Sequence, residues 1–316
     1  NNLHFNYGGD LGLGVNPKLI ERINKSDYLV LLGGRLSENP SQGFSLLGIP
    51  EHNKTFVHIH PGPEEIGRIY KPHLGIACSP ISFVNALNNA LKGLNVKASS
   101  QNQILASQAH EEYLEWGNMP LEAPNSGVDL TTAFRNLREN LDANTIITNG
   151  AGNYAVWGHR LFRFTNFGTQ LAPISGSMGY GLPAAIAAKL RNPNKTVIAL
   201  AGDGCFQMTE NEFATAVQYN AGVIVFVVDN EMYGTIRMHQ HKNYKGKYKH
   251  TGLINPDFNK LAVAMGGQGY TVEKTEDFMS IYYEAREWTN KNNLPSLLHI
   301  KTGSEMVLPG KRFSSL

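Results

Sequence analysis

Two long apolar runs, each ending in a side chain that carries oxygen, constrain this chain more than any other feature. The first run is TVIALAGD, ending at Asp203, and the second is VIVFVVDN, ending at Asn230. Continuous apolar, β-branched runs of this kind are typical of buried parallel strands. Between them, Thr209 to Tyr219 has helical periodicity, and Thr209 and Glu212 have the spacing of a capping box. The segment therefore predicts a strand, a Gly-Asp-Gly turn, a helix and a second strand.

The two polar strand ends predict a metal site. In a right-handed βαβ unit both strands end at the same edge of the sheet, where open α/β sheets bind ligands. We therefore expect Asp203 and Asn230 to lie a few ångströms apart. Their oxygens and a nearby main-chain carbonyl suit Mg²⁺, which completes its octahedron with water and substrate phosphates. Gly202 and Gly204 would let the backbone approach a phosphate, and the helix that opens near Thr209 would add its positive end.

Composition narrows the class of protein. The chain has 316 residues, 41% of them hydrophobic and 17% charged, which is enough for two domains. A net charge of +2 gives no reason to expect nucleic acid or a membrane as partner. No apolar run reaches membrane-spanning length. With only two cysteines and no signal-peptide pattern at the start, we expect a reducing, cytoplasmic environment.

The pattern of apolar residues and breakers divides the chain into two α/β units joined by a linker. We predict one domain over residues 1–96, a linker with one helix over 97–128, and a second domain over 129–316. In the first domain, the predicted strands are 28–33 and 55–59, and the predicted helices are 17–25 and 80–91. In the second, beside the segment described above, they are strands at 145–148 and 296–300 and helices at 130–141, 183–190, 256–265 and 275–291.

Three separated motifs resemble one family. Gly-Asp-Gly followed by Asn at this distance resembles the signature of thiamine diphosphate enzymes. Ile174 to Lys189 (ISGSMGYGLPAAIAAK) resembles the segment of the acetolactate synthase and benzoylformate decarboxylase group that holds the cofactor's aminopyrimidine. Thr148 to Arg160 (TNGAGNYAVWGHR) resembles the loop that meets the diphosphate. The likeness covers Val128 to the end and, more loosely, residues 1–95. It implies an α/β fold of two doubly wound parallel-sheet domains: an incomplete middle domain and a diphosphate-binding domain.

The resemblance also implies site residues. Mg²⁺ would be held by Asp203, Asn230 and the main-chain carbonyl of Met232. Thiamine diphosphate would contact a set of turn and helix-start residues: Asn149, Gly150, Gly152, Asn153, Gly176, Met178, Gly202, Gly204, Cys205, Gly234 and Thr235. In this set the Gly176 carbonyl would accept a hydrogen bond from the cofactor's amine.

Several of these residues also have simpler explanations. Met178 could be core filler rather than the prop that bends the cofactor into a reactive geometry, although the neighbouring motifs favour the prop. Asn149 to Tyr154 could be a plain turn rather than an anion-binding nest of N–H groups. At Cys205 the backbone N–H is a better donor than the thiol. Asp229 stands where many relatives have a second asparagine, which changes the charge beside the site.

Other features are weaker signals. Gly9 to Gly14 (GDLGLG) hints at dinucleotide binding but lacks an acidic ribose partner. FAD is not expected, because His58 and His60 stand where the acetolactate synthase pattern is rich in Asp. These histidines lack the further ligands of a zinc site and are more simply a strand end. The basic stretch from His239 to His250 is interpreted as a mobile lid rather than an RNA-binding tract.

The resemblance implies that the catalytic glutamate belongs to a pyrimidine-binding domain that we do not find here, so we expect no catalytic residue in this chain. The chain is then the C-terminal portion of a Mg²⁺- and thiamine diphosphate-dependent enzyme that decarboxylates or ligates 2-oxo acids. A homodimer or homotetramer, or a partner chain carrying the missing domain, is implied. An alternative is a non-catalytic cofactor-binding or assembly subunit. A third class, a nicotinamide oxidoreductase, would require nicotinamide binding by the first unit.

Overall fold

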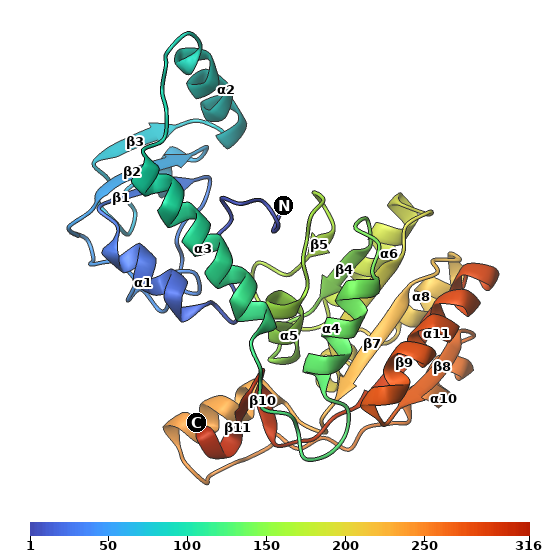
Figure 1. Cartoon of the computed structure of the whole chain (residues 1–316). Coiled ribbons are helices and arrows are strands. Elements are labelled where there is room, and N and C mark those ends of the chain that lie inside the picture. The colour runs from blue at the N-terminus through green and yellow to red at the C-terminus, as the bar shows by residue number, and fades with distance from the viewer. The chain divides into compact units, whose positions relative to one another are not determined.

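The computed structural model describes every residue from Asn1 to Leu316, and the chain forms two compact units (Figure 1). The small unit is His4–Gly117, and the large unit is Asn118–Leu316 together with Asn1–Leu3. Each unit is a parallel sheet with flanking helices, so the predicted α/β class is confirmed. The helix expected between residues 97 and 128 is α3 (Ser100–Asn118). The domain boundaries proposed from the sequence stay a prediction.

The small unit contains a three-stranded parallel sheet in the order β1-β2-β3. Its strands are β1 (Tyr28–Leu32), β2 (Thr55–His60) and β3 (Leu74–Ala77), and its helices are α1 (Pro17–Lys25), the short η1 (Pro63–Glu65), α2 (Pro80–Leu91) and α3. Asn16 and Ser79 cap α1 and α2 through their side chains, and each helix has a proline in its first turn. The core of this unit is small and contains Leu36, Leu46, Leu47, Phe56 and Tyr70.

The large unit contains a six-stranded, entirely parallel sheet in the order β5-β4-β6-β7-β9-β8. Its strands are β4 (Ile146–Asn149), β5 (Gln170–Leu171), β6 (Val197–Gly202), β7 (Ile224–Asp229), β8 (Gln268–Val272) and β9 (Ser296–Lys301). A separate antiparallel hairpin pairs β10 (Met306–Leu308) with β11 (Lys311–Arg312).

The helices of the large unit are α4 (Leu130–Asn140), α5 (Tyr154–Leu161), α6 (Gly181–Arg191), α7 (Asp203–Phe206), α8 (Glu212–Gln218), α9 (Gly234–Asn243), α10 (Phe258–Ala264) and α11 (Phe278–Asn292), with the short η2 (Thr275–Asp277) and η3 (Phe313–Ser315). None of the helices in the chain combines the length and the apolar composition that crossing a membrane requires.

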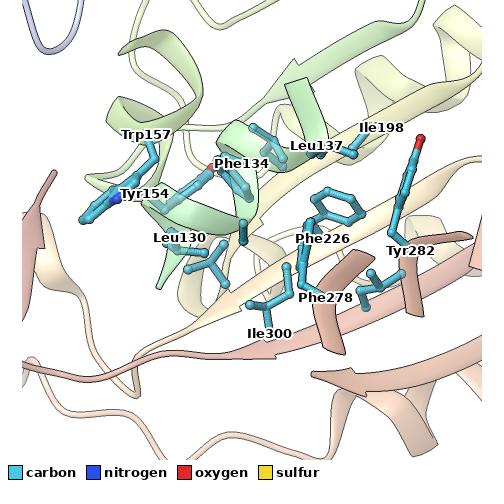
Figure 2. Close-up of a cluster of buried hydrophobic side chains, with 14 of the residues drawn as sticks. Leu130, Phe134, Leu137, Tyr154, Trp157, Ile198, Phe226, Phe278, Tyr282 and Ile300 are labelled. Atoms are coloured by element: carbon cyan, nitrogen blue, oxygen red, sulfur yellow. The ribbon is translucent and has the colours of Figure 1, made fainter. Parts of the chain in front are cut away.

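Helices cover both faces of this sheet, and each face has its own core. Alternate residues of β7 point to opposite faces: Phe226 joins one cluster and Val225 the other. Helices α4, α5 and α11 supply the partners on the first face, where Figure 2 shows Phe134, Phe226, Phe278 and Tyr282 gathered together. Helices α6, α8 and α10 supply those on the second. This double cover explains why β6 and β7 are apolar along their whole length.

Three local expectations are wrong. The expected Gly-Asp-Gly turn opens a short helix, α7, at Asp203. The next helix, α8, begins at Glu212 with Asn211 as its N-cap, and no capping box forms. Thr209 instead donates its hydroxyl hydrogen bond to the carbonyl of Gly179, 2.8 Å away, because that carbonyl lies beside it in the fold. The loop expected over residues 148–160 contains a helix, α5, from Tyr154 onward.

Candidate cofactor and metal site

The candidate site lies where the direction of the chain through the sheet reverses. From β4 the chain adds β5 on one side and then crosses to add β6 on the other, and ligands of open α/β sheets bind at such a switch point. The register pairs Asn149 with Leu200 and Gly202 with Val228. Asp203 and Asn230 therefore follow neighbouring strands at the same edge, as the apolar runs predicted.

A cavity of about 230 Å³ opens at this edge. It is lined by residues at or after the ends of β4, β5, β6 and β7: Ala151, Gly152, Asn153, Tyr154, Gly176, Met178, Gly202, Asp203, Gly204, Cys205, Val228, Asn230, Met232, Tyr233, Gly234, Thr235 and Ile236. All of the predicted site residues except Asn149 and Gly150 line this cavity. Asn149 is buried, and its amide donates to the Gly150 carbonyl at 2.8 Å. Gly150 packs against Cys205, whose sulfur a Cβ at Gly150 would meet at 2.3 Å.

Asp203 is the buried carboxylate of the site. One of its oxygens accepts a hydrogen bond from the N–H of Gly204 and the other from Nδ2 of Asn255, each at 2.8 Å. Burial, with a smaller contribution from the nearby Asp229 carboxylate, raises the pKa of Asp203 to about 6. Both hydrogen bonds oppose this shift. A cation in the cavity would favour the ionised form of this carboxylate.

Asp229 lies beside Asp203 and is bound by three groups. Burial disfavours its charge, but hydrogen bonds from His299, the Glu231 N–H and Asn255 outweigh burial and lower the pKa of Asp229 below its usual value. His299 Nε2 lies 2.7 Å from one Asp229 oxygen, and Asn255 Nδ2 lies 2.7 Å from the other. The sequence left the effect of an aspartate at this position open. The structure answers that question, because His299 on β9 and the Glu231 N–H hydrogen-bond the carboxylate.

The segment after β7 forms the other side of the candidate metal site. The carbonyl of Met232, predicted as a metal ligand, accepts a hydrogen bond from the N–H of Gly234 at 2.9 Å. A second lone pair remains on this oxygen. A Cβ at Gly234 would lie 3.3 Å from Nδ2 of Asn230, so the tight turn around Asn230 favours glycine. The N–H of Tyr233 donates to the Thr251 carbonyl at 2.9 Å, which fixes this segment against the returning chain.

The start of α9 forms a wall that suits an anion. Gly234, Thr235 and Ile236, in its first turn, line the cavity, and the N-cap residue Tyr233 makes no side-chain capping bond. The N-terminus of a helix presents unpaired N–H groups and the positive end of the helix dipole. Asn153 is held to this turn, since its N–H donates to Thr235 Oγ1 at 3.0 Å and Thr235 Oγ1 donates to Asn153 Oδ1 at 2.8 Å.

Cys205 connects three of the predicted loops through its side chain. Its sulfur accepts hydrogen bonds from the hydroxyl of Tyr154 at 3.2 Å and from the N–H of Gly179 at 3.1 Å. Burial raises the pKa of Tyr154 well above its usual value, so the phenol remains protonated and can donate. The thiol is therefore an acceptor that organises the site, a role that sequence reasoning missed.

Aromatic neighbours explain why only glycine fits on either side of Asp203. A Cβ at Gly202 would come within 2.8 Å of the Tyr154 ring, and one at Gly204 within 2.5 Å of the Tyr233 ring. Gly176 has a φ of +68° and open space around it, so a left-handed turn requires glycine there. Met178 is half-buried, lines the cavity and packs against the core.

The residues present fit a diphosphate and a hard cation. Asp203, Asn230 and Met232 offer a carboxylate, an amide oxygen and a main-chain carbonyl, which is the oxygen chemistry that Mg²⁺ prefers. The uncapped start of α9 supplies amide donors and positive potential for a phosphate. Elsewhere, no group of three or more His, Cys, Asp or Glu side chains is arranged to hold a metal.

The other motifs examined in the sequence have local structural roles. His58 Nε2 lies 3.0 Å from the Gly34 carbonyl, and His60 Nδ1 accepts from the Gly62 N–H at 3.0 Å, so both rings are bound to main chain at the end of β2. The basic stretch from His239 continues α9 to Asn243. The guanidinium of Arg237, also on α9, lies 4.6 Å from the centroid of the Tyr248 ring, which belongs to the basic stretch. Whether this segment moves as a lid stays a prediction.

Comparison with known proteins identifies the family. Residues 150–300 match the model described as thiamine pyrophosphate enzyme, C-terminal TPP binding domain, and residues 1–87 match the model of the central domain of the same enzymes. Thiamine pyrophosphate is another name for thiamine diphosphate. The first match includes the whole cavity lining, and the second includes the sheet of the small unit.

Curated relatives agree with the family models. The mitochondrial acetolactate synthase catalytic subunit of Aspergillus candidus is 39% identical over 182 residues, which are 57% of this chain and 26% of that protein. The mitochondrial acetolactate synthase of Schizosaccharomyces pombe is 30% identical over 266 residues, 81% of this chain and 39% of that protein. The acetolactate synthase large subunit of Porphyra purpurea is 28% identical over 312 residues, 96% of this chain and 51% of that protein.

The chain thus spans about half, or less, of the length of these relatives. The resemblance carried by the three sequence motifs is confirmed across both units. The chain therefore belongs to the thiamine pyrophosphate enzymes, and among them it resembles the acetolactate synthases.

Proposed function

We propose that this chain carries the diphosphate-binding half of a Mg²⁺- and thiamine diphosphate-dependent enzyme that acts on 2-oxo acids. The observation that carries the proposal is one cavity that brings together Asp203, Asn230, Met232 and the start of α9. When bound, thiamine diphosphate supplies an electron sink for breaking the bond between the carbonyl carbon and the carboxylate of a 2-oxo acid.

The residues of this chain bind and orient the cofactor. Oxygens of Asp203, Asn230 and Met232 would hold Mg²⁺, and the first turn of α9 would bind the diphosphate. Met178 lines the same cavity and would pack against the cofactor. The apolar walls around them exclude water from the reacting centre.

The class of reaction follows from the relatives. Several relatives that match most of this chain are acetolactate synthases, so we propose decarboxylation of a 2-oxo acid followed by protonation or by ligation to a second carbonyl compound. Both cysteines are free thiols, which agrees with the cytoplasmic location that we propose.

Exposed apolar side chains beside the cavity support a partner chain. Ile174, two residues before the cavity residue Gly176, is fully exposed, and so is Ile254, next to Asn255. Ile236 lines the cavity and is 49% exposed. Exposed apolar side chains on segments beside a binding site are typical of surfaces that bind another protein. We propose that a second copy, in a homodimer or homotetramer, or a chain with a pyrimidine-binding domain covers them.

The cavity lining also favours a second candidate, in which this chain alone binds the cofactor but is inactive. No glutamate lines the cavity, whereas the family chemistry implied by the resemblance uses one. On this view, the isolated chain would not decarboxylate pyruvate, benzoylformate or glyoxylate, and adding a pyrimidine-binding partner would restore the reaction. Turnover by the isolated chain would rule this candidate out while leaving the proposed reaction class intact.

Replacing Asp203 tests the proposed metal and cofactor site. Asp203→Ala should weaken Mg²⁺-dependent binding of thiamine diphosphate by about 100-fold or more, because it removes the charged metal ligand. Isothermal titration calorimetry measures this loss. Asp142→Ala, an exposed aspartate of the same unit that lies off the cavity lining, should bind like the wild type. Wild-type affinity in Asp203→Ala would refute the proposed metal site.

A further inference from the structure

Asn255 lies between the two buried carboxylates of the site. Its Nδ2 donates one hydrogen bond to Asp203 at 2.8 Å and another to Asp229 at 2.7 Å. Its Oδ1 accepts from Nε2 of Gln207 at 2.9 Å, which fixes the orientation of the amide. One nitrogen therefore serves both carboxylates, and the side chain cannot flip without losing all three bonds.

Two carboxylates lie side by side here because of the register of the sheet. Gly202 on β6 pairs with Val228 on β7, so the residues that follow them, Asp203 and Asp229, lie at the same level. Asp203 is 3% exposed and Asp229 is 5% exposed. His299 on β9 hydrogen-bonds Asp229, whereas no basic side chain contacts Asp203. Without a donor between them, two buried carboxylates repel one another and would turn apart.

We propose that Asn255 is a positioning residue for the metal site: its amide holds the Asp203 carboxylate beside Asp229 in the orientation that a divalent cation requires. This inference rests on the proposed function and extends it to a residue outside the cavity lining. It also assigns Gln207 a supporting role, because Gln207 fixes the amide of Asn255.

An amide suits this position better than other side chains. A lysine or arginine would neutralise the carboxylate charge that the cation needs. An aspartate would add a third negative charge, and an aliphatic residue would donate nothing. Asparagine provides two N–H groups on one nitrogen and adds no charge. Residues that orient a metal ligand in this way typically change metal affinity by about 10- to 100-fold when they are replaced.

The test is calorimetric titration of Mg²⁺ into the full chain with saturating thiamine diphosphate. Asn255→Ala should weaken Mg²⁺ binding by about 10-fold or more. Asn259→Ala is a matched control: Asn259 is equally half-buried on the adjacent α10 and bonds Thr271 instead. This control should stay within about 2-fold of the wild type.

A double variant separates positioning from simple loss of structure. In Asn255→Ala the carboxylates of Asp203 and Asp229 face one another without a donor between them. Adding Asp229→Asn removes one of the two charges and should recover Mg²⁺ affinity several-fold. A purely structural role predicts no recovery, because Asp229→Asn leaves a single side-chain oxygen for the hydrogen bonds from His299 and the Glu231 N–H. Unfolding temperatures of the cofactor-free variants, measured in parallel, report any general loss of stability.

The outcomes distinguish this inference from the proposed function. If the wild-type chain shows no Mg²⁺-dependent binding of thiamine diphosphate, the proposed function fails and the inference fails with it. If the wild type binds but Asn255→Ala binds within 2-fold of it, or the double variant recovers nothing, the inference alone is overturned. Should Asn255→Ala fail to fold, Gln207→Met decides: a loss of Mg²⁺ affinity in the same direction supports the inference, and wild-type affinity overturns it.

Discussion

The two sheets of this protein are built from similar strands but are covered differently. The strand YLVLL of the small unit and VIALAG of the large unit are both continuous apolar runs. Every residue of the second is buried, whereas Tyr28, Val30 and Leu32 of the first are exposed. Helices cover both faces of the large sheet, while α2 of the small unit buries none of its residues. An apolar run therefore specifies a strand, but the covering helices decide how much it stabilises the fold.

The same contrast applies to the polar residues at the strand ends. His58 and His60 in the small unit bind main-chain groups and leave no cavity of useful size, since the nearby hollow measures about 10 Å³. Asp203 and Asn230 in the large unit face a cavity of about 230 Å³. A sheet held on both faces keeps its edge rigid enough to position a binding site.

The largest expected effect contrasts the two cores directly. Phe226→Ala should destabilise the large unit by about 3–5 kcal/mol, because Phe226 is fully buried and packs against Phe278 at 5.6 Å between ring centroids. Leu74→Ala on β3 should cost no more than about 1 kcal/mol, because Leu74 is 53% exposed. Chemical denaturation of both variants measures the difference. Equal losses would mean that the small sheet is covered in solution.

A smaller effect should depend on pH and reports on the site. Burial raises the pKa of Asp203 from 3.8 to about 6. The native state then holds this proton more tightly than the unfolded state, so its stabilising contribution is present below pH 4 and is lost as the pH rises through 6. In the metal- and cofactor-free protein, the stability gained by Asp203→Asn should grow by up to about 3 kcal/mol between pH 4 and pH 7.5.

Urea denaturation of both proteins with a chelator present measures this change. A stability difference between variant and wild type that stays constant over this pH range would argue against a burial-raised pKa at Asp203. Asp142→Asn, an exposed aspartate of the same unit, provides the reference for surface carboxylates and should show no such trend.

The smallest effect concerns the small unit. Glu112 on α3 pairs with Arg22 on α1, and this hydrogen bond lowers the pKa of Glu112. The ion pair therefore stabilises the fold above pH 4.5, the pKa of the unfolded state. This contribution is lost as the pH falls through the lowered pKa of the folded state. Since both side chains are about one quarter exposed, Glu112→Gln should cost only about 0.5–1 kcal/mol at pH 7, and less in 1 M salt. A cost above about 2 kcal/mol would contradict the small contribution that we expect from a partly exposed ion pair.

Sequence reasoning placed most of the regular elements and most of the site. It placed the buried strands β6 and β7, because short, continuous, β-branched apolar runs are typical of buried parallel strands, and the resemblance to known motifs named the residues around the cavity. It missed the helices α5, α7 and α9 and the strands β3, β5, β8, β10 and β11, whose apolar runs are brief. It also missed Tyr154, Asn255 and His299 as parts of the site, because nothing in their neighbouring residues signals partners on distant strands.

The amino-acid sequence by itself determined that two strands are followed by Asp203 and Asn230 at one edge of a parallel sheet, since periodicity and turn chemistry are local properties. Only the tertiary structure decided which groups share a hydrogen bond there. Asn255 reaches Asp203 and Asp229, and Cys205 accepts from Tyr154 and Gly179, because strand register and helix packing bring distant positions together. Such contacts depend on how the strands pair and the helices pack across the whole sheet, which no short stretch of sequence encodes.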